Sequence, residues 1–431
     1  MIKLIVVLGG TALASALAVY MTSTPLQKLL TLAFISGLCL YSGVGGASSE
    51  VPTYYLVYYF AILVAFVVSF KVFCVFLYQP SRNLSSVLSK VFSTVDRAVA
   101  WRMVIWITIG LHLLLLIYPE FRLHLLFAPP APDLVTFWAR QWAGEQVDAF
   151  SKILEYLRLL LMPFFYVALY RYRNRITRAA AMLLGLLYIR YVATGYVGRG
   201  MILMTIALIG LVIWIHRPRL RPALVVLAVA MLPLILLGSY AYGVIRLGGS
   251  VAGLGLQQMA AVIDMETSFP RKVGVPIIES GRRVNLWDYA KWIVTLPIPK
   301  VLTGEIGGAR VNYEISEAIL GISRGDTGWF VVLPGFVAEA VYIFGPYLFW
   351  LHAVFVALLA AWAARVLERT PQFLFLAGYV TLLFGYVLNR GGISAMLPVI
   401  INEFLLFYVF ILLSWIHVRR RGSWRVRLLA E

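Results

Sequence analysis

Several arginines lie inside or directly beside apolar stretches of the sequence, where a charged side chain is costly and by default indicates function. Arg190 falls late in one such stretch, and Arg390 follows another and precedes two glycines. Arg199 stands between Gly198 and Gly200. Glycine lets a ligand approach the backbone closely, and a guanidinium group can hold two phosphate oxygens at once. These residues therefore predict a site for an anionic lipid headgroup or a pyrophosphate.

A structural explanation is also open for each of these charges, because a charge inside an apolar segment is commonly paired. Arg190 with Glu403 is one such ion pair, and Glu339 also lies within an apolar stretch. Both readings require helices that position the charged side chains.

The composition identifies those helices. The chain has 431 residues, 61% of them hydrophobic and 13% charged, whereas soluble domains are about 45–50% apolar and about 25% charged. A membrane-crossing helix needs about 20 mainly apolar residues. Apolar runs cover residues 4–21, 28–46, 54–79, 101–118, 150–169, 179–197, 200–215, 223–245, 330–364, 372–389 and 394–416. The sequence predicts an all-α polytopic membrane protein with about 11 transmembrane helices, forming a single integral membrane domain over residues 1–431.

Two of these runs are unusual. The run 330–364 is too long for one straight span, so we expect a tilt, a kink at Gly345-Pro346 or a continuation outside the bilayer. The run 4–21 has Lys3 before it and small residues near its end, as in a signal peptide. We interpret it as an uncleaved first span.

The charge distribution predicts the orientation. The loops 170–178 and 216–222 carry arginines and no acid, and further arginines follow residue 416. Because cytoplasmic loops are enriched in Lys and Arg, we expect these segments and the C-terminus to be cytoplasmic. The net charge of +18 lies mostly at the ends of apolar runs, which favours an anionic membrane surface over nucleic acid.

The segments 119–149 and 246–329 fall on the opposite face by parity. In the first, Trp138 and Trp142 lie one helical turn apart, which predicts either a short interfacial helix or an ordinary interfacial aromatic belt. The second is long enough to carry function, and we expect the catalytic elements there. The same face holds Arg190, Arg199, Arg246 and Arg390.

Motifs for several other activities are absent. The sequence lacks the nucleotide phosphate-binding loop, the lipase motif GxSxG and the zinc-protease motif HExxH. Its five histidines show no ligand spacing, and Asp264 with Glu266 resembles a cation-binding pair only loosely. Cys39 and Cys74 lie in apolar stretches. We therefore expect no metal site, no cofactor and no disulfide framework.

Three segments resemble the bacterial O-antigen polymerases of the Wzy type, which polymerise oligosaccharide repeat units. Residues 194–200 are similar to the Gly-Arg turn of that family, and residues 296–300 to its Leu-Pro-x-Pro element. Residues 333–345 are similar to its Glu-x-x-x-x-Phe-Gly element, which opens a late span. Together these segments lie within about half of the chain.

The resemblance implies the all-helical membrane architecture of O-antigen ligases and polymerases, with a large periplasmic loop, in the bacterial inner membrane. It implies a metal-independent glycosyltransferase that moves the growing glycan from undecaprenyl pyrophosphate to the next lipid-linked repeat unit at the periplasmic face. The partners would be this lipid-linked oligosaccharide, membrane lipids and, as a further candidate, a chain-length regulator protein. The related ligases use a periplasmic histidine, which 246–329 lacks. The catalytic base is therefore expected to be a carboxylate.

Under this interpretation, each candidate residue has a role. The leaving pyrophosphate needs cations, and the acceptor hydroxyl needs a base. The candidate bases are Asp326 and Glu314, followed by Glu339, which could instead orient an arginine. The candidate pyrophosphate ligands are Arg199, Arg310 and Arg390, supported by Arg190 and Arg246. The candidate glycan ligands are Arg271, Arg324, Tyr196 and Tyr313, although tyrosines are also common at membrane interfaces.

Three other functions remain open. An O-antigen ligase would differ only in its acceptor. A flippase for lipid-linked oligosaccharides would need charges along a path through the bilayer, whereas the charges within the apolar runs lie mostly on one side. A non-catalytic scaffold in a polysaccharide-export complex would need no reactive site.

Overall fold

The computed structural model describes residues 2–77, 106, 109–110, 162–194, 199–246, 253, 255–298, 310–324, 326, 329–368, 370–413 and 416. Within these residues the chain is helical and contains no strand. The predicted loop at 119–149 and the arginine-rich tail after residue 416 lie outside the described residues.

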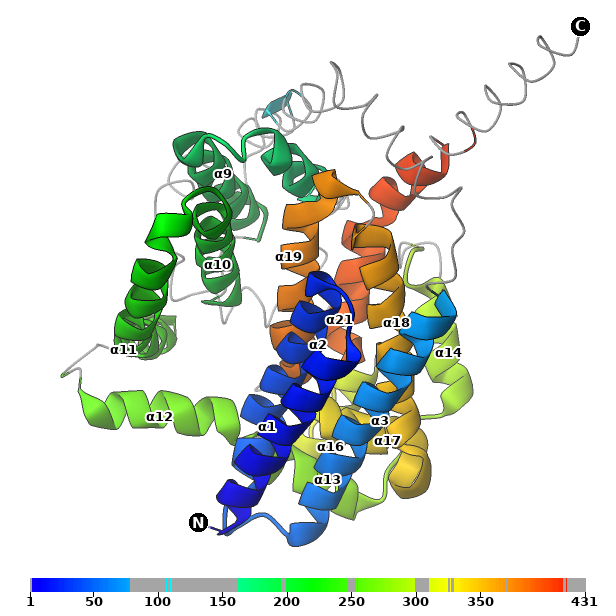
Figure 1. Cartoon of the computed structure of the whole chain (residues 1–431). Helices are drawn as coiled ribbons and strands as arrows, with labels where there is room; N and C mark the ends of the chain where they lie inside the picture. Colours follow the sequence, from blue (N-terminus) through cyan, green and yellow to red (C-terminus); the bar gives the residue numbers. More distant parts are fainter. Residues whose placement is uncertain are drawn as a thin grey trace, which may run out of the picture.

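Five helical segments among the described residues are long and apolar enough to cross a membrane. They are α1 (Ile2–Met21), α2 (Pro25–Leu38) with its π-helical continuation η1 (Cys39–Val44), α3 (Thr53–Leu77), α18 (Trp350–Glu368), and a fifth segment built from η5 (Pro371–Phe373), α19 (Leu374–Leu382), η6 (Leu383–Val387) and α20 (Leu388–Gly391). They form a bundle in which α3 packs along α18 and α2 packs on α1 and η6 (Figure 1). The chain is therefore an all-α membrane protein.

A sixth apolar segment is broken. It comprises α21 (Ile393–Pro398), η7 (Val399–Glu403) and a helix over residues 405–413, and it bends by 46° between its two halves. Its aromatic side chains meet a helix at residues 162–171, since the Phe164 ring lies 5.3 Å from the Phe407 ring.

Three further helices stand beside this bundle in Figure 1: α9 (Ile176–Thr194), α10 (Arg199–His216) and α11 (Arg221–Arg246). The 3-10 turn η2 (Pro218–Leu220) connects the last two, and α10 contacts α19. These helices correspond to three of the runs found in the sequence.

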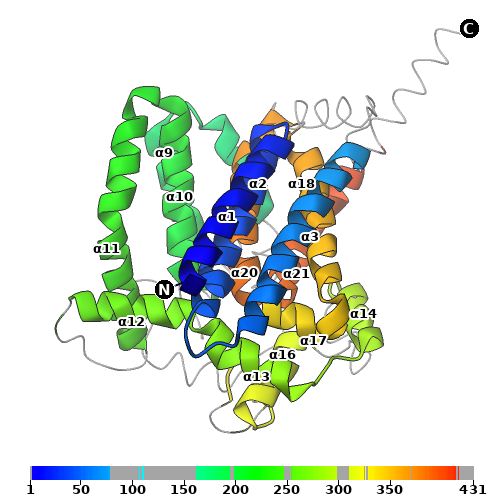
Figure 2. The same cartoon turned by 60° about the horizontal axis from the view of Figure 1, so that its bottom comes forward.

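Shorter helices gather at one end of the bundle (Figure 2). They are α12 (Leu256–Thr267), η3 (Pro270–Gly274), α13 (Val275–Ser280), α14 (Leu286–Thr295), α16 (Val311–Leu320) and α17 (Phe336–Leu348). Gly345, with φ of 75° and ψ of 178°, breaks the helical path directly before Pro346. This break confirms the predicted kink in the run 330–364, which becomes the short α17 and the long α18.

The arginine-bearing turns lie at the opposite end of the bundle from α12 and α13 (Figure 2). These turns are residues 170–175 and η2. The start of α1 lies at the α12 end, because the Lys3 ammonium donates to the carbonyl of Val51 at 2.7 Å and Glu50 pairs with Arg271. The relative placement agrees with the parity argument, while the assignment of each end to a compartment stays a prediction.

We expect the α12 end to face the periplasm. In a background with Cys39→Ala and Cys74→Ala, Arg282→Cys, exposed between α13 and α14, should react with a membrane-impermeant thiol reagent in cells with a permeabilised outer membrane. Arg219→Cys in η2 is the matched control and should react only after the inner membrane is lysed. The reverse pattern would invert the topology.

Candidate functional site

Glu339 is a fully buried carboxylate in the first turn of α17. Its oxygens accept hydrogen bonds from the backbone N–H groups of Ile393 and Ser394, at 2.5 and 2.8 Å. The Ser394 hydroxyl donates another, and Nε2 of His352 on α18 lies 2.9 Å from the carboxylate. Because these groups come from three helices, the carboxylate joins α17, α18 and α21. We call Glu339, His352, Ile393 and Ser394 the Glu339 clamp.

The turn before α21 approaches this carboxylate closely. Gly392 has a φ of 73°, which favours glycine, and a Cβ at this position would lie 2.1 Å from a Glu339 oxygen. Two residues earlier, the carbonyl of Arg390 accepts a hydrogen bond from the backbone N–H of Gly335 at 3.1 Å. The clamp and this bond therefore fix the backbone position of Arg390.

The Arg390 side chain is engaged by an acid on α12. Its guanidinium donates to Glu266 at 3.3 Å, and Nη1 lies 2.8 Å from the Tyr386 hydroxyl. Both charged side chains are about one-fifth exposed, at 21% and 18%. A pyrophosphate could reach Arg390 only in competition with Glu266.

Arg271 is also paired with acids. Its guanidinium donates to Glu50 at 2.9 Å and lies 3.5 Å from Asp264. This pairing connects η3 and α12 to the loop between α2 and α3. Arg271 could therefore hold a glycan, as predicted, only after leaving these acids.

Arg310 and Arg324 flank the ring of Tyr313. Their guanidinium carbons lie 5.2 and 4.7 Å from the ring centroid, and Nη1 of Arg310 donates to the Tyr313 hydroxyl at 2.8 Å. Trp329 packs edge-on against the same tyrosine, with ring centroids 5.5 Å apart. We call these four residues the arginine–tyrosine cluster.

Neither arginine of this cluster pairs with an acid in the part of the chain that the structure describes: no described carboxylate oxygen lies within 4.0 Å of either guanidinium. Nε of Arg310 is also buried without a hydrogen-bond partner among those residues. The structure thus brings together two of the predicted cations and one of the predicted tyrosines. Two guanidinium groups near one tyrosine ring, without a described counter-charge, are suited to an anion.

Glu314 lies in the first turn of α16, four residues after Arg310, which precedes the helix. It is half-buried and accepts a hydrogen bond from the Tyr342 hydroxyl at 3.1 Å. Burial raises the pKa of the Glu314 carboxyl, the Tyr342 hydrogen bond opposes that rise, and the nearby acids Asp288 and Glu317 add to it. A raised pKa improves a carboxylate as a proton acceptor near neutral pH.

Asp326 is exposed and holds a turn. One of its oxygens accepts a hydrogen bond from the backbone N–H of Ser323 at 2.7 Å. Its position two residues after Arg324 places it near the arginine–tyrosine cluster in the chain, and it stays a candidate base.

The segment between α16 and α17 connects the cluster to the clamp. The backbone N–H of Val332 donates to the Ser316 hydroxyl on α16 at 2.7 Å, and that of Gly335 donates to the Arg390 carbonyl. Three residues of extended chain span at most about 11 Å. The two groups therefore belong to one end of the bundle and lie close together.

The remaining predicted residues have no described side chains. Arg190 lies within α9, Arg199 begins α10 and Arg246 ends α11. Their side chains, and Tyr196 as a whole, lie outside the described residues.

Three contributors were not identified from the sequence. Glu266 was noted only as a loose cation-binding pair with Asp264, not as a partner of Arg390, and His352 is a single histidine in an apolar run. Ser394 carried no signal, because its role depends on the fold of a turn. Among the described residues, no three His, Cys, Asp or Glu side chains converge as a metal site.

Comparisons with protein-family models, with curated proteins and with solved structures give no match. The function is therefore inferred from the site.

We expect the clamp to contribute strongly to stability. Gly392→Ala combines a left-handed backbone with a collision against Glu339, so it should cost more than about 2 kcal/mol and lower the apparent Tm of the purified protein. Gly238→Ala, in α11 with open space around its Cβ, is the control and should be neutral or slightly stabilising. Equal melting temperatures for Gly392→Ala and the wild type would contradict the clamp.

Proposed function

We propose that the protein polymerises lipid-linked oligosaccharide repeat units, moving the growing glycan from undecaprenyl pyrophosphate to the next repeat unit. The observation that supports this most is the arginine–tyrosine cluster. Its two guanidinium groups lie at one end of a membrane bundle and pair with no described acid. The charged pyrophosphate of a lipid carrier lies at the membrane surface, which is where the end of such a bundle is located.

The reaction would use the described residues as follows. The acceptor hydroxyl attacks the anomeric carbon of the growing glycan, and the bond from that carbon to the pyrophosphate oxygen breaks. Arg310 and Arg324 stabilise the charge that develops on the leaving pyrophosphate. Glu314 accepts the proton of the attacking hydroxyl, because its raised pKa suits this transfer.

The other predicted residues have secondary places in this proposal. Asp326 is the alternative base, on the exposed turn after α16. Arg390 would join the pyrophosphate only after leaving Glu266. Glu339, with its oxygens occupied by four donors, acts by positioning the turn that carries Arg390.

The proposal includes a location. The active site faces the periplasm from the bacterial inner membrane, and the C-terminus is cytoplasmic, because the arginine-bearing turns lie at the end away from the site. A flippase is less well supported, since the described arginines lie at the two ends of the bundle rather than along a path through it.

Purified protein given lipid-linked repeat units alone, with EDTA, should produce a ladder of longer glycans on a gel. Arg310→Lys should lower the polymerisation rate roughly 100- to 1000-fold, because lysine acts as a point charge where the guanidinium binds bidentately. Arg219→Lys, at the opposite end, should retain the wild-type rate. Absence of a ladder, or transfer only to a lipid A–core acceptor, would reject the polymerase in favour of another function.

The rate should also depend on pH through Glu314. The base works when ionised, so activity should be lost as the pH falls through its raised pKa. Tyr342→Phe removes the hydrogen bond that lowers this pKa, and should therefore shift the acidic limb of the rate profile to higher pH. An unchanged limb in Tyr342→Phe, with the limb lost in Asp326→Asn, would assign the base to Asp326.

A further inference from the structure

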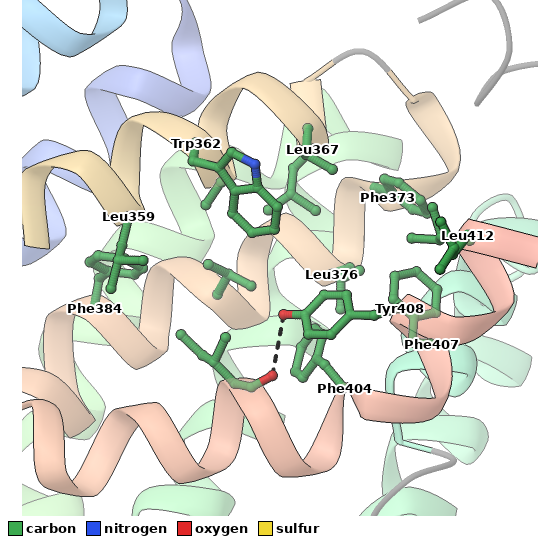
Figure 3. Close-up of a pocket in the computed structure, with 15 residues that line it drawn as sticks. Leu359, Trp362, Leu367, Phe373, Leu376, Phe384, Phe404, Phe407, Tyr408 and Leu412 are labelled. Atoms are coloured by element: carbon green, nitrogen blue, oxygen red, sulfur yellow. Dashed lines mark hydrogen bonds between the residues drawn. The ribbon is translucent and has the colours of Figure 1, made fainter. Parts of the chain in front are cut away.

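An apolar pocket of about 310 Å³ lies between α18, α19 and the broken final span (Figure 3). All its lining residues are hydrophobic, and the only side-chain polar groups among them belong to Trp362 and Tyr408. The Tyr408 hydroxyl is used internally, since it donates to the carbonyl of Ile400 at 3.2 Å. The pocket therefore suits hydrocarbon and offers little to a polar headgroup.

The pocket opens on the outer surface of the bundle. Trp362 and Leu412, on two different walls, are 47% and 54% exposed and form its rim. Phe373, Leu376 and Phe384 form its floor and are almost fully buried. In a membrane, such an opening meets lipid chains.

The depth of the pocket matches one leaflet. Its α18 wall runs from Leu359 to Leu367, eight residues apart and one residue short of the helix end, so it is about 12 Å deep at a rise of 1.5 Å per residue. Half of the hydrocarbon core of a bilayer is about 15 Å. The volume of about 310 Å³ is enough for part of an acyl chain.

One end of the pocket lies at the arginine-bearing end of the bundle. Leu367, Phe373 and Leu412 are at this end, beside the turn after α18 (Figure 3). The helix over residues 162–171, which packs on the final span through Phe164, leads into the turn that carries Arg171 and Arg173. These cations are placed at headgroup level, where they attract anionic lipid.

We propose that this pocket binds one acyl chain of an anionic phospholipid from the leaflet at the arginine-bearing end. A chain entering from the α12 end would have to cross the far leaflet before reaching Leu359. The site is independent of the reaction proposed above, and its chain fills the angle between α18 and the bent final span.

Photo-crosslinking tests the proposal on the wild-type chain. Phosphatidylglycerol with a diazirine in the middle of one acyl chain, added to the full-length protein in nanodiscs, should label peptides containing Leu359, Phe384 or Ile400. Excess polyprenyl phosphate should leave this labelling unchanged. Labelling confined to other faces of the bundle, or loss of labelling with polyprenyl phosphate, would overturn the phospholipid assignment.

A matched pair of variants gives a second test. Ala363→Phe fills the pocket, and should remove one retained phospholipid per chain in native mass spectrometry. Leu358→Phe, exposed on the same helix and outside the pocket, should retain it. Equal lipid counts in the two variants would contradict the proposal, and the crosslinking result decides if Ala363→Phe fails to fold.

Discussion

The buried carboxylate of Glu339 is the constraint on which this end of the bundle depends. Removing a carboxylate from water is costly unless its oxygens are satisfied. Here two backbone N–H groups at the start of α21, a serine hydroxyl and a histidine ring supply that compensation. The N–H groups of a helix start lack partners within the helix, so acid and helix satisfy each other. Three helices must therefore keep their relative positions.

This constraint separates two kinds of arginine. The position of Arg390 is fixed beside the clamp, because its carbonyl is bound by the N–H group of Gly335 and its side chain is paired with Glu266. Arg310 and Arg324 lie around Tyr313, without a described acid to satisfy them. The first arrangement favours a rigid scaffold, whereas the second leaves charge to be satisfied by a ligand. The predicted pyrophosphate site therefore rests mainly on α16 and the turn after it.

Apolar length in the sequence predicted several of the long helices, but neither the short helices within 246–329 nor the contacts between helices. Apolar length placed α1, α3 and α10 closely, and Gly345-Pro346 predicted the kink that Gly345 makes within α17. The pair Arg390–Glu266 joins residues 124 positions apart, and spacing cannot reveal it. The suggested pair of Arg190 with Glu403 stays a prediction, because the Arg190 side chain lies outside the described residues, while Glu403 accepts a hydrogen bond from Tyr379. The sequence suggested that Glu339 orients an arginine. It orients Arg390 indirectly, by binding the backbone N–H groups of the following turn, and the residue types in that turn do not reveal such contacts.

The π-helical segments η6 and η7 need the same compensation as the buried carboxylate, because their backbone polar groups must also find partners within the protein. A π-helical turn leaves carbonyl groups poorly paired, which a membrane tolerates only where protein groups satisfy them. Asn389 does this for η6, donating to the carbonyls of Phe384 and Phe34 at 2.8 and 3.2 Å. Tyr408 does it for η7 through Ile400. A polar side chain thus accompanies each of these breaks. Because of these breaks, α19–α20 and the final span meet at the turn that carries Arg390 at one end of the bundle. Toward the other end they diverge and leave room for the apolar pocket.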